Sequence, residues 1–173
     1  MQIVEQTPAA SPSSAAIKSK SGKYLTFGLG TEEFGVQVLH VREIMGIQPI
    51  TAVPQTPHFV KGVLNLRGKV IPVVDLRLKF GLPEIEYNQR TCIIVTQIQQ
   101  TAQQRMVGII VDGVSEVLTI QGDDIEDTPD FGNGIEIPYL LGMAKLKGKV
   151  KILLNINKVL TAGDLEGLDG IAN

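Results

Sequence analysis

Short runs of apolar residues, broken by Gly, Pro and polar turns, follow one another along most of the chain. Their length and their alternation with polar positions are typical of β-strands. The segments that we predict as strands are 24–29, 34–38, 63–66, 70–74, 93–98, 106–111, 114–120 and 150–154. Many short strands at regular spacing, with little helical pattern between them, predict a mostly β fold of the sandwich or barrel type.

Helical periodicity is weak and confined to short segments. Residues 39–45 would place Val41, Ile44 and Met45 on one face of a helix, because positions three and four apart share a face. A second short helix is predicted over residues 155–160. The few short helices therefore accompany the strands and do not alternate with them as in a βαβ enzyme.

Four other segments carry local expectations. Residues 1–22 are rich in Ser, Ala, Pro and Gln and predict a disordered tail. Residues 163–173 are expected to form a C-terminal tail or a short helix. The Gln-rich segment 99–104 predicts a solvated loop between two strands. Pro72 has no backbone N–H, so its strand should lie at a sheet edge or contain a bulge.

The chain shows signs of an internal duplication. Residues 62–70 overlay residues 142–150 without gaps at an offset of 80, and residues 35–44 overlay residues 108–117 at an offset of 73. Both overlays occur in the same order, which favours two copies of one β module. The alternative is that any two hairpins with basic-Gly turns look alike.

A module of about 70 residues is marginally stable alone. We therefore expect two modules, with a boundary near residues 80–90, that share a buried seam. An exchange of strands between them stays open. A groove at such a seam is a natural docking place for a partner.

Composition narrows the function classes. The net charge of −2 and a pI near 5.7 argue against nucleic acid or an anionic membrane as the main partner. Trp is absent and aromatic residues make up 5%, which disfavours single-stranded nucleic-acid binding. A single cysteine excludes an internal disulfide. Neither a membrane span nor a signal peptide is recognised, so we expect a cytoplasmic protein.

Catalytic constellations are not evident. His40 and His58 are the only histidines, they are not spaced as a metal pair, and no nucleophile elbow or phosphate-binding glycine loop is present. We therefore predict no enzyme activity, no cofactor and no metal. A carboxylate enzyme is the alternative, and finding Asp75 and Asp112 together in a deep pocket would favour it.

The distinctive polar residues are Arg42, Glu43, Asn65 and Arg67. Asn65 and Arg67 lie in Asn-Leu-Arg-Gly at a predicted hairpin tip. A charged residue at a tight tip can serve recognition, because the backbone orders it before binding. A plain solvated turn is the alternative interpretation.

Three longer stretches carry a family resemblance. They are Phe-Gly-Val-Gln-Val-Leu-His-Val-Arg-Glu-Ile at 34–44, Phe-Val-Lys-Gly-Val-Leu-Asn-Leu-Arg-Gly at 59–68 and Ile-Pro-Val-Val-Asp-Leu-Arg at 71–77. Together they resemble the CheW-like family of chemotaxis coupling proteins. The resemblance implies a fold of two small five-stranded β-barrels over residues 23–162.

The same resemblance implies a scaffold function. It implies that the chain couples the cytoplasmic tips of methyl-accepting chemoreceptors to the histidine kinase CheA, which it would contact through the CheW-like regulatory domain of the kinase. We expect a monomer, without direct membrane contact, recruited to receptor arrays at the inner membrane. An adaptor of the same fold in another receptor–kinase pathway, such as surface motility, is the alternative. The expected partner-binding residues are Val38, Val41, Arg42, Glu43, Gly62, Asn65 and Arg67.

Overall fold

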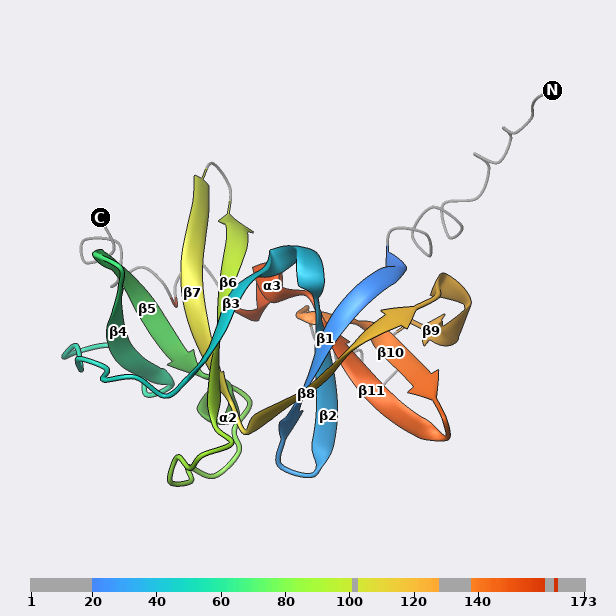
Figure 1. Cartoon of the computed structure of the whole chain (residues 1–173), viewed down its shortest axis with the longest axis horizontal. Coiled ribbons are helices and arrows are strands. Elements are labelled where there is room, and N and C mark those ends of the chain that lie inside the picture. Colours follow the sequence, from blue (N-terminus) through green and yellow to red (C-terminus); the bar gives the residue numbers. More distant parts are fainter. Residues whose placement is uncertain (1–19, 101–102, 128–137, 161–163, 165–173) are drawn as a thin grey trace.

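The computed structural model describes residues 20–100, 103–127, 138–160 and 164. The described strands are β1 (Gly22–Leu29), β2 (Glu32–Gln37), β3 (Val41–Gly46), β4 (Val60–Leu66), β5 (Lys69–Asp75), β6 (Cys92–Gln100), β7 (Gln103–Val111), β8 (Gly113–Ile120), β9 (Ile125–Glu126), β10 (Leu140–Leu146) and β11 (Lys149–Leu154). The helical turns are η2 (Val38–His40), α2 (Leu76–Lys79), η3 (Gly122–Asp124) and α3 (Ile156–Val159). The prediction of a mostly β chain with a few short helices is confirmed (Figure 1).

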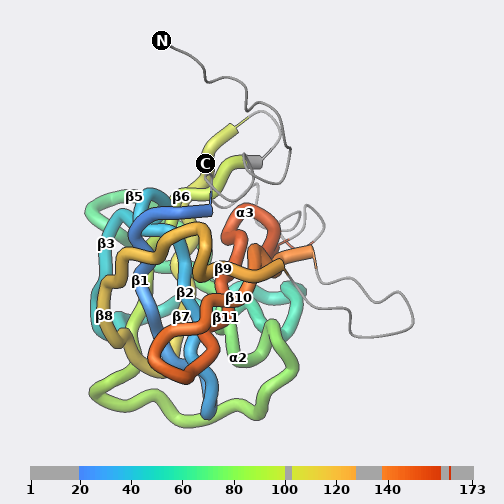
Figure 2. The backbone as a smooth tube through the Cα atoms, turned by 90° about the vertical axis from the view of Figure 1, so that its right-hand side faces the viewer, coloured from blue at the N-terminus to red at the C-terminus, as the bar shows by residue number. Residues whose placement is uncertain are grey.

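The described strands form two sheets. The six-stranded sheet has the order β8-β1-β2-β11-β10-β9, and the five-stranded sheet has the order β3-β6-β7-β5-β4. The two sheets lie side by side in Figure 1, and the six-stranded sheet is nearest the viewer in Figure 2. Closure of each sheet into a barrel stays a prediction.

The chain passes from one sheet to the other at two places. It leaves the six-stranded sheet after β2 through η2, builds the whole five-stranded sheet from β3 to β7, and returns at Asp112. Residues 80–90, where we expected a module boundary, connect two strands of the same sheet, β5 and β6. The boundary between the two sequence repeats therefore does not coincide with the boundary between the two sheets.

Each sheet takes strands from both sequence repeats. The first repeat comprises β1–β5, and the second comprises β6–β8, β10 and β11. In the five-stranded sheet, β6 and β7 of the second repeat join β3, β4 and β5 of the first. In the six-stranded sheet, β1 and β2 of the first repeat join β8, β10 and β11 of the second. The exchange is thus reciprocal.

The two overlaid hairpins have the same backbone conformation at their turns. The hairpin turns at Arg67-Gly68 and Lys147-Gly148 all have positive φ, with values of 50°, 87°, 54° and 79°. Two consecutive positive φ values are typical of the type I′ turns that connect twisted strands. Asp75 and Asn155 accept hydrogen bonds from the backbone of the helices α2 and α3 that follow each hairpin. The similarity of the two hairpins thus extends to the capped helix that follows each of them.

Three apolar clusters fill the fold. One lies within the five-stranded sheet, around Val73, Ile93 and Val95, and one lies within the six-stranded sheet, around Tyr24 and Leu153. The largest cluster takes residues from both sheets and from α3. Strands β5 and β6 face two clusters, because alternate residues of a strand point to opposite faces.

The predicted helix over residues 39–45 is wrong. Only η2 is helical there, and β3 follows it at Val41. Burial alternates from one residue to the next along β3, with Val41 half-buried and Arg42 exposed. This period of two is that of a strand, and pairing with β6 supplies the backbone hydrogen bonds. The short helix predicted near residues 155–160 is confirmed as α3.

Two further local predictions need correction. The Gln-rich loop is mostly strand, because β6 continues to Gln100 and β7 begins at Gln103. Strand β5, which contains Pro72, is internal and without a bulge at Pro72. Its pairing with β7 begins only at Val73, so the missing N–H of Pro72 interrupts no described ladder.

Most of the predicted tails, at residues 1–19, 163 and 165–173, lies outside the described residues. Within the described part of the chain, no helix has the length and apolar character that a membrane span requires.

Candidate partner-binding site

The Asn-Leu-Arg-Gly motif forms the tip of the β4–β5 hairpin. The Asn65 Oδ1 atom accepts a hydrogen bond from the Gly68 backbone N–H at 2.9 Å. This contact satisfies a backbone donor inside the turn, and it helps to hold Arg67 in its left-handed conformation, with φ of 50°. Asn65 therefore shapes the tip from which the Arg67 side chain projects.

Arg67 forms a two-pronged ion pair with Glu43 of β3. The Nη2 atom of Arg67 lies 2.5 Å from Oε1 of Glu43, and its Nη1 atom lies 3.3 Å from Oε2. The hydrogen bonds from the guanidinium lower the pKa of Glu43, and the carboxylate raises the pKa of Arg67. The fork geometry of the guanidinium matches a carboxylate in this way.

This pair connects opposite edges of one sheet. Strand β3 is the first strand of the five-stranded sheet, and β4, which leads to Arg67, is the last. The sheet must therefore curve until its two edges approach each other. The Arg67 side chain remains 71% exposed and that of Glu43 33% exposed, so a partner can reach both charges.

The other predicted residues on β3 and η2 divide into two groups. Arg42 is exposed, and its Nε atom donates to Oε1 of Gln97 at 2.5 Å. Val38 and Val41 are half-buried and pack against the cluster between the sheets. The structure thus brings Glu43 and Arg67 together at the surface. Arg42 contacts Gln97 instead, and the two valines lie partly in the core.

Gly62 is buried and acts through the backbone. Its φ of 144° is one that side chains rarely adopt, and a Cβ atom there would lie 2.0 Å from the carbonyl oxygen of Thr51. That carbonyl accepts a hydrogen bond from the Val63 N–H at 2.9 Å. Gly62 therefore lets the segment at Thr51 lie against β4, and it has no side chain with which to contact a partner.

Sequence reasoning missed the exposed apolar residues near this site. Leu39 is 65% exposed and Ile44 is 44% exposed, and they lie on η2 and beside Glu43 in β3. The predicted helix places Ile44 on the same face as Val41, whereas in β3 Ile44 is exposed and Val41 is half-buried. Residues 41–46 do not alternate between apolar and polar types, so the sequence carries no period-two signal for the outward direction of Ile44.

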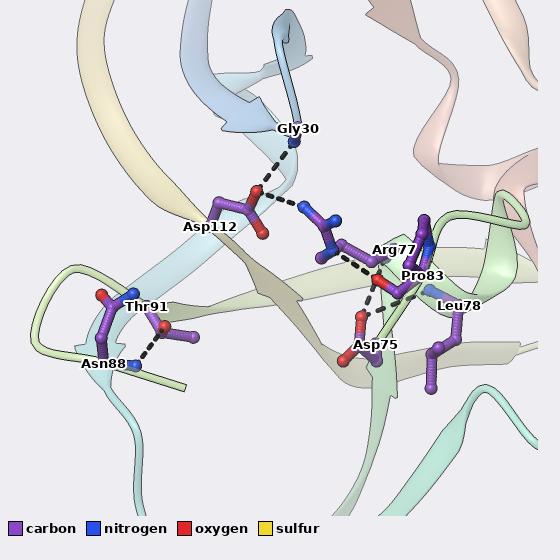
Figure 3. A network of polar contacts seen from close by, with 8 residues as sticks. All are labelled: Gly30, Asp75, Arg77, Leu78, Pro83, Asn88, Thr91 and Asp112. Atoms are coloured by element: carbon purple, nitrogen blue, oxygen red, sulfur yellow. Dashed lines mark hydrogen bonds and ion pairs between the residues drawn. The ribbon is translucent and has the colours of Figure 1, made fainter. Parts of the chain in front are cut away.

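Asp75 and Asp112 do not form a catalytic pair. The Oδ1 atom of Asp75 accepts hydrogen bonds from the backbone N–H groups of Arg77 and Leu78 at 2.9 and 3.4 Å, which caps α2 (Figure 3). The Oδ2 atom of Asp112 accepts from Nη1 of Arg77 at 2.6 Å and from the Gly30 N–H at 2.8 Å. Both carboxylates therefore have structural partners.

The pocket that would favour an enzyme is not found at these residues. Asp112 lines a hollow of about 370 Å³, and Asp75 is not among its lining residues. Asp75 is itself 2% exposed and accepts a further hydrogen bond from the Tyr87 hydroxyl at 2.8 Å. Burial, together with this carboxylate, raises the pKa of Tyr87. The contacts connect α2 with the loop after it.

Comparison with known proteins identifies the family. The model of the CheW-like domain matches residues 23–164. The chain belongs to the CheW-like domain family. The chemotaxis protein CheW of Klebsiella aerogenes is 39% identical over 150 residues, which cover 87% of this chain and 88% of that protein. The chemotaxis protein CheW of Rhizobium meliloti is 37% identical and covers 82% of this chain and 89% of its own length.

A solved structure agrees with this assignment. The scaffolding protein TtCheW from Thermoanaerobacter tengcongensis has a TM-score of 0.73 and 32% sequence identity, over 83% of this chain and 95% of that chain. The expected resemblance to CheW-like proteins is thereby confirmed. Members of the family are non-catalytic scaffolds, so this chain is an adaptor and not an enzyme, and its relatives support a role in chemotaxis.

Proposed function

We propose that this CheW-like chain couples the cytoplasmic tip of a chemoreceptor to the histidine kinase CheA. The observation that carries the proposal is the Glu43–Arg67 pair at the meeting edges of the five-stranded sheet. It places a carboxylate and a guanidinium at fixed positions on the surface. The relationship of this chain to CheW proteins supports the choice of the receptor and the kinase as partners.

The residues of the site would have different roles in partner binding. Glu43, Arg67 and Arg42 offer charge-assisted contacts at the edge, while Val38 and Val41 form the apolar wall beside them. Apolar anchors with a polar rim are the usual anatomy of a specific interface. Asn65 and Gly62 hold the tip and the β4 edge in shape, and their effect on binding is indirect.

In this proposal, the kinase is bound through its own CheW-like regulatory domain. The chain acts as a cytoplasmic monomer before it joins receptor arrays at the inner membrane. Transient signalling contacts of this kind have micromolar affinities, roughly −8 kcal/mol.

A paired binding assay tests the proposal. The purified chain should bind a soluble receptor-tip fragment and a CheA fragment in isothermal titration calorimetry. Arg67→Ala and Glu43→Arg should each weaken receptor binding about tenfold without unfolding the chain. The matched control is Lys147→Ala, because Lys147 occupies the same turn position in the second repeat, with φ of 54°, and has no acidic partner among the described residues.

The outcomes separate the possibilities. If Lys147→Ala weakens receptor binding as much as Arg67→Ala does, the Glu43–Arg67 edge is not the receptor site. Absence of binding to both fragments at high micromolar concentration would remove the adaptor proposal for this pathway. Partial recovery of binding in the exchanged variant Glu43→Arg with Arg67→Glu would show that the pair acts through the shape it imposes on the sheet.

A second candidate is the same adaptor role in a different receptor–kinase pathway. Protein FrzA of Myxococcus xanthus is 29% identical over 140 residues, so relatives of this chain include one that does not carry the CheW name. Binding to a kinase from such a pathway, with no binding to CheA, would favour this candidate.

A further inference from the structure

The two sequence repeats are held together by four strand pairs. These are β1 with β8, β2 with β11, β3 with β6 and β5 with β7. In every one of them, one strand belongs to the first repeat and the other to the second. The contact between the repeats therefore runs through both sheets.

The apolar clusters are shared in the same way. In the five-stranded sheet, Leu64, Ile71 and Val73 of the first repeat pack with residues of the second repeat that include Ile93 and Ile110. These side chains are at most 4% exposed. Separation of the repeats would expose each cluster to water. A first repeat therefore needs a second repeat, and a second repeat needs a first, to bury its apolar surface.

The covalent connection between the repeats is confined to one segment. Residues 80–91 run from the end of α2 to the start of β6 and contain no strand. The segment is held to the first repeat, by the Leu82 N–H with the Arg77 carbonyl at 2.7 Å and by Lys61 of β4 with Glu84 at 2.8 Å. Most of its residues are exposed. The segment also contacts both sheets, through the hydrogen bond of Tyr87 to Asp75 of β5 and the stacking of Phe80 on Phe34 of β2. It contributes no strand to either sheet.

We propose that a second copy of this chain can supply the complementary repeat, which gives a strand-exchanged dimer. The first repeat of one copy would pair with the second repeat of the other, and all four strand pairs would be retained. Only the path of residues 80–91 would differ between the closed monomer and this dimer. Exchange of an identical element costs little for that reason, and high protein concentration during folding favours it.

The proposed dimer would keep the candidate partner-binding site complete. Glu43 and Arg67 both belong to the first repeat, so each half of the dimer contains the whole ion pair. If the proposed function holds, one dimer would present two receptor sites. The exchange itself does not depend on which partner binds there.

Cysteine pairs test the exchange in the full chain. Lys23 of β1 and Thr119 of β8 are directly opposite each other, both are exposed, and they belong to different repeats. In a Cys92→Ala background, chains with Lys23→Cys and chains with Thr119→Cys are mixed, unfolded and refolded together at high concentration, then oxidised. A covalent dimer on a non-reducing gel is expected, because opposite residues of a strand pair lie within disulfide distance.

A matched pair within one repeat provides the control. Lys145 of β10 and Val150 of β11 are also opposite and exposed, but both belong to the second repeat. Chains that carry Lys145→Cys and Val150→Cys separately should give no covalent dimer, because exchange never brings these positions of two copies together. Chains with both Lys23→Cys and Thr119→Cys should close the disulfide internally when refolded dilute.

Each outcome decides for or against the proposal. A covalent dimer with the inter-repeat pair alone supports the exchange. Dimers with both pairs, or with neither, overturn it, because they indicate random collision or no exchange. Light scattering on the unmodified chain, refolded at the same high concentration, gives an independent readout. A product that is entirely monomeric at 18.7 kDa also overturns the proposal.

Discussion

Replacement of Gly62 by alanine is a sharp test of the packing at the candidate site. The backbone of Gly62 has φ of 144°, and the added Cβ would lie 2.0 Å from the carbonyl oxygen and 2.6 Å from the carbonyl carbon of Thr51. Both atoms belong to the backbone, so no flexible side chain can move away. The segment at Thr51 must shift from β4, and the two hydrogen bonds between Thr51 and Val63, each 2.9 Å, would be lost or lengthened.

The magnitude follows from these two effects. A residue forced into an unfavourable backbone region costs about 1–3 kcal/mol, and each lost hydrogen bond costs about 0.5–1.5 kcal/mol. We therefore expect Gly62→Ala to lower the free energy of unfolding by about 3 kcal/mol. With a urea dependence of about 2 kcal/mol per molar, the unfolding midpoint should fall by about 1.5 M.

Gly68→Ala is the matched control for this prediction. Gly68 also has a positive φ, 87°, but a Cβ atom there would meet nothing within 4 Å. Its replacement should therefore cost only the backbone strain, about 1 kcal/mol. Urea unfolding followed by circular dichroism measures both variants. If Gly62→Ala costs no more than Gly68→Ala, the close approach of Thr51 does not explain the glycine.

Three other predictions concern acid, alkali and the helix cap. Burial raises the pKa of Tyr24 to about 12 and also raises the pKa of Tyr87 and Tyr139. Absorbance at 295 nm should therefore show all three tyrosines ionising with midpoints above pH 10, and stability should fall as the pH rises above 10. A normal titration near pH 10 in the folded chain would contradict this. The hydrogen bond from Lys151 lowers the pKa of Glu33. The stability that this pair contributes is therefore present above pH 4.5 and is lost as the pH falls through the pKa of Glu33 in the folded chain. Glu33→Gln should reduce the dependence of urea unfolding on acid pH, and an unchanged dependence would refute a stabilising role for the pair. Asp75→Ala removes the α2 cap and should cost about 2 kcal/mol in thermal unfolding, whereas Asn155→Ala, at the cap with one backbone contact, should cost less.

The pattern of strands and turns could be predicted because it depends on local chemistry. Alternating apolar residues and basic-Gly turns identified both hairpins, and the glycine at the second turn position explains why the tip at Arg67 is so tight. The helix predicted at 39–45 failed because pairing with β6 decided the conformation of this segment. Strand pairing between distant segments has no local signal.

The geometry of the candidate site also depends on contacts between distant segments, which the sequence does not reveal. The motifs identified Glu43 and Arg67, but nothing in the sequence shows that one sheet curves until these residues, 24 positions apart, form an ion pair. The role of Gly62 likewise depends on Thr51, which reaches β4 only in the folded chain. The exchange of strands between repeats also follows from long-range pairing, which periodicity does not reveal.

The order in which the strands are joined has a consequence for synthesis of the chain. Strand β1 ends at Leu29, yet its partner β8 begins only at Gly113, and β2 must wait for β11, which begins at Lys149. On the ribosome, the first hairpin therefore emerges long before the strands on either side of it exist. Its apolar face would be open to chaperones or to neighbouring nascent chains for most of translation. The five-stranded sheet, complete once β7 is made, should be the first part of the protein to become stable.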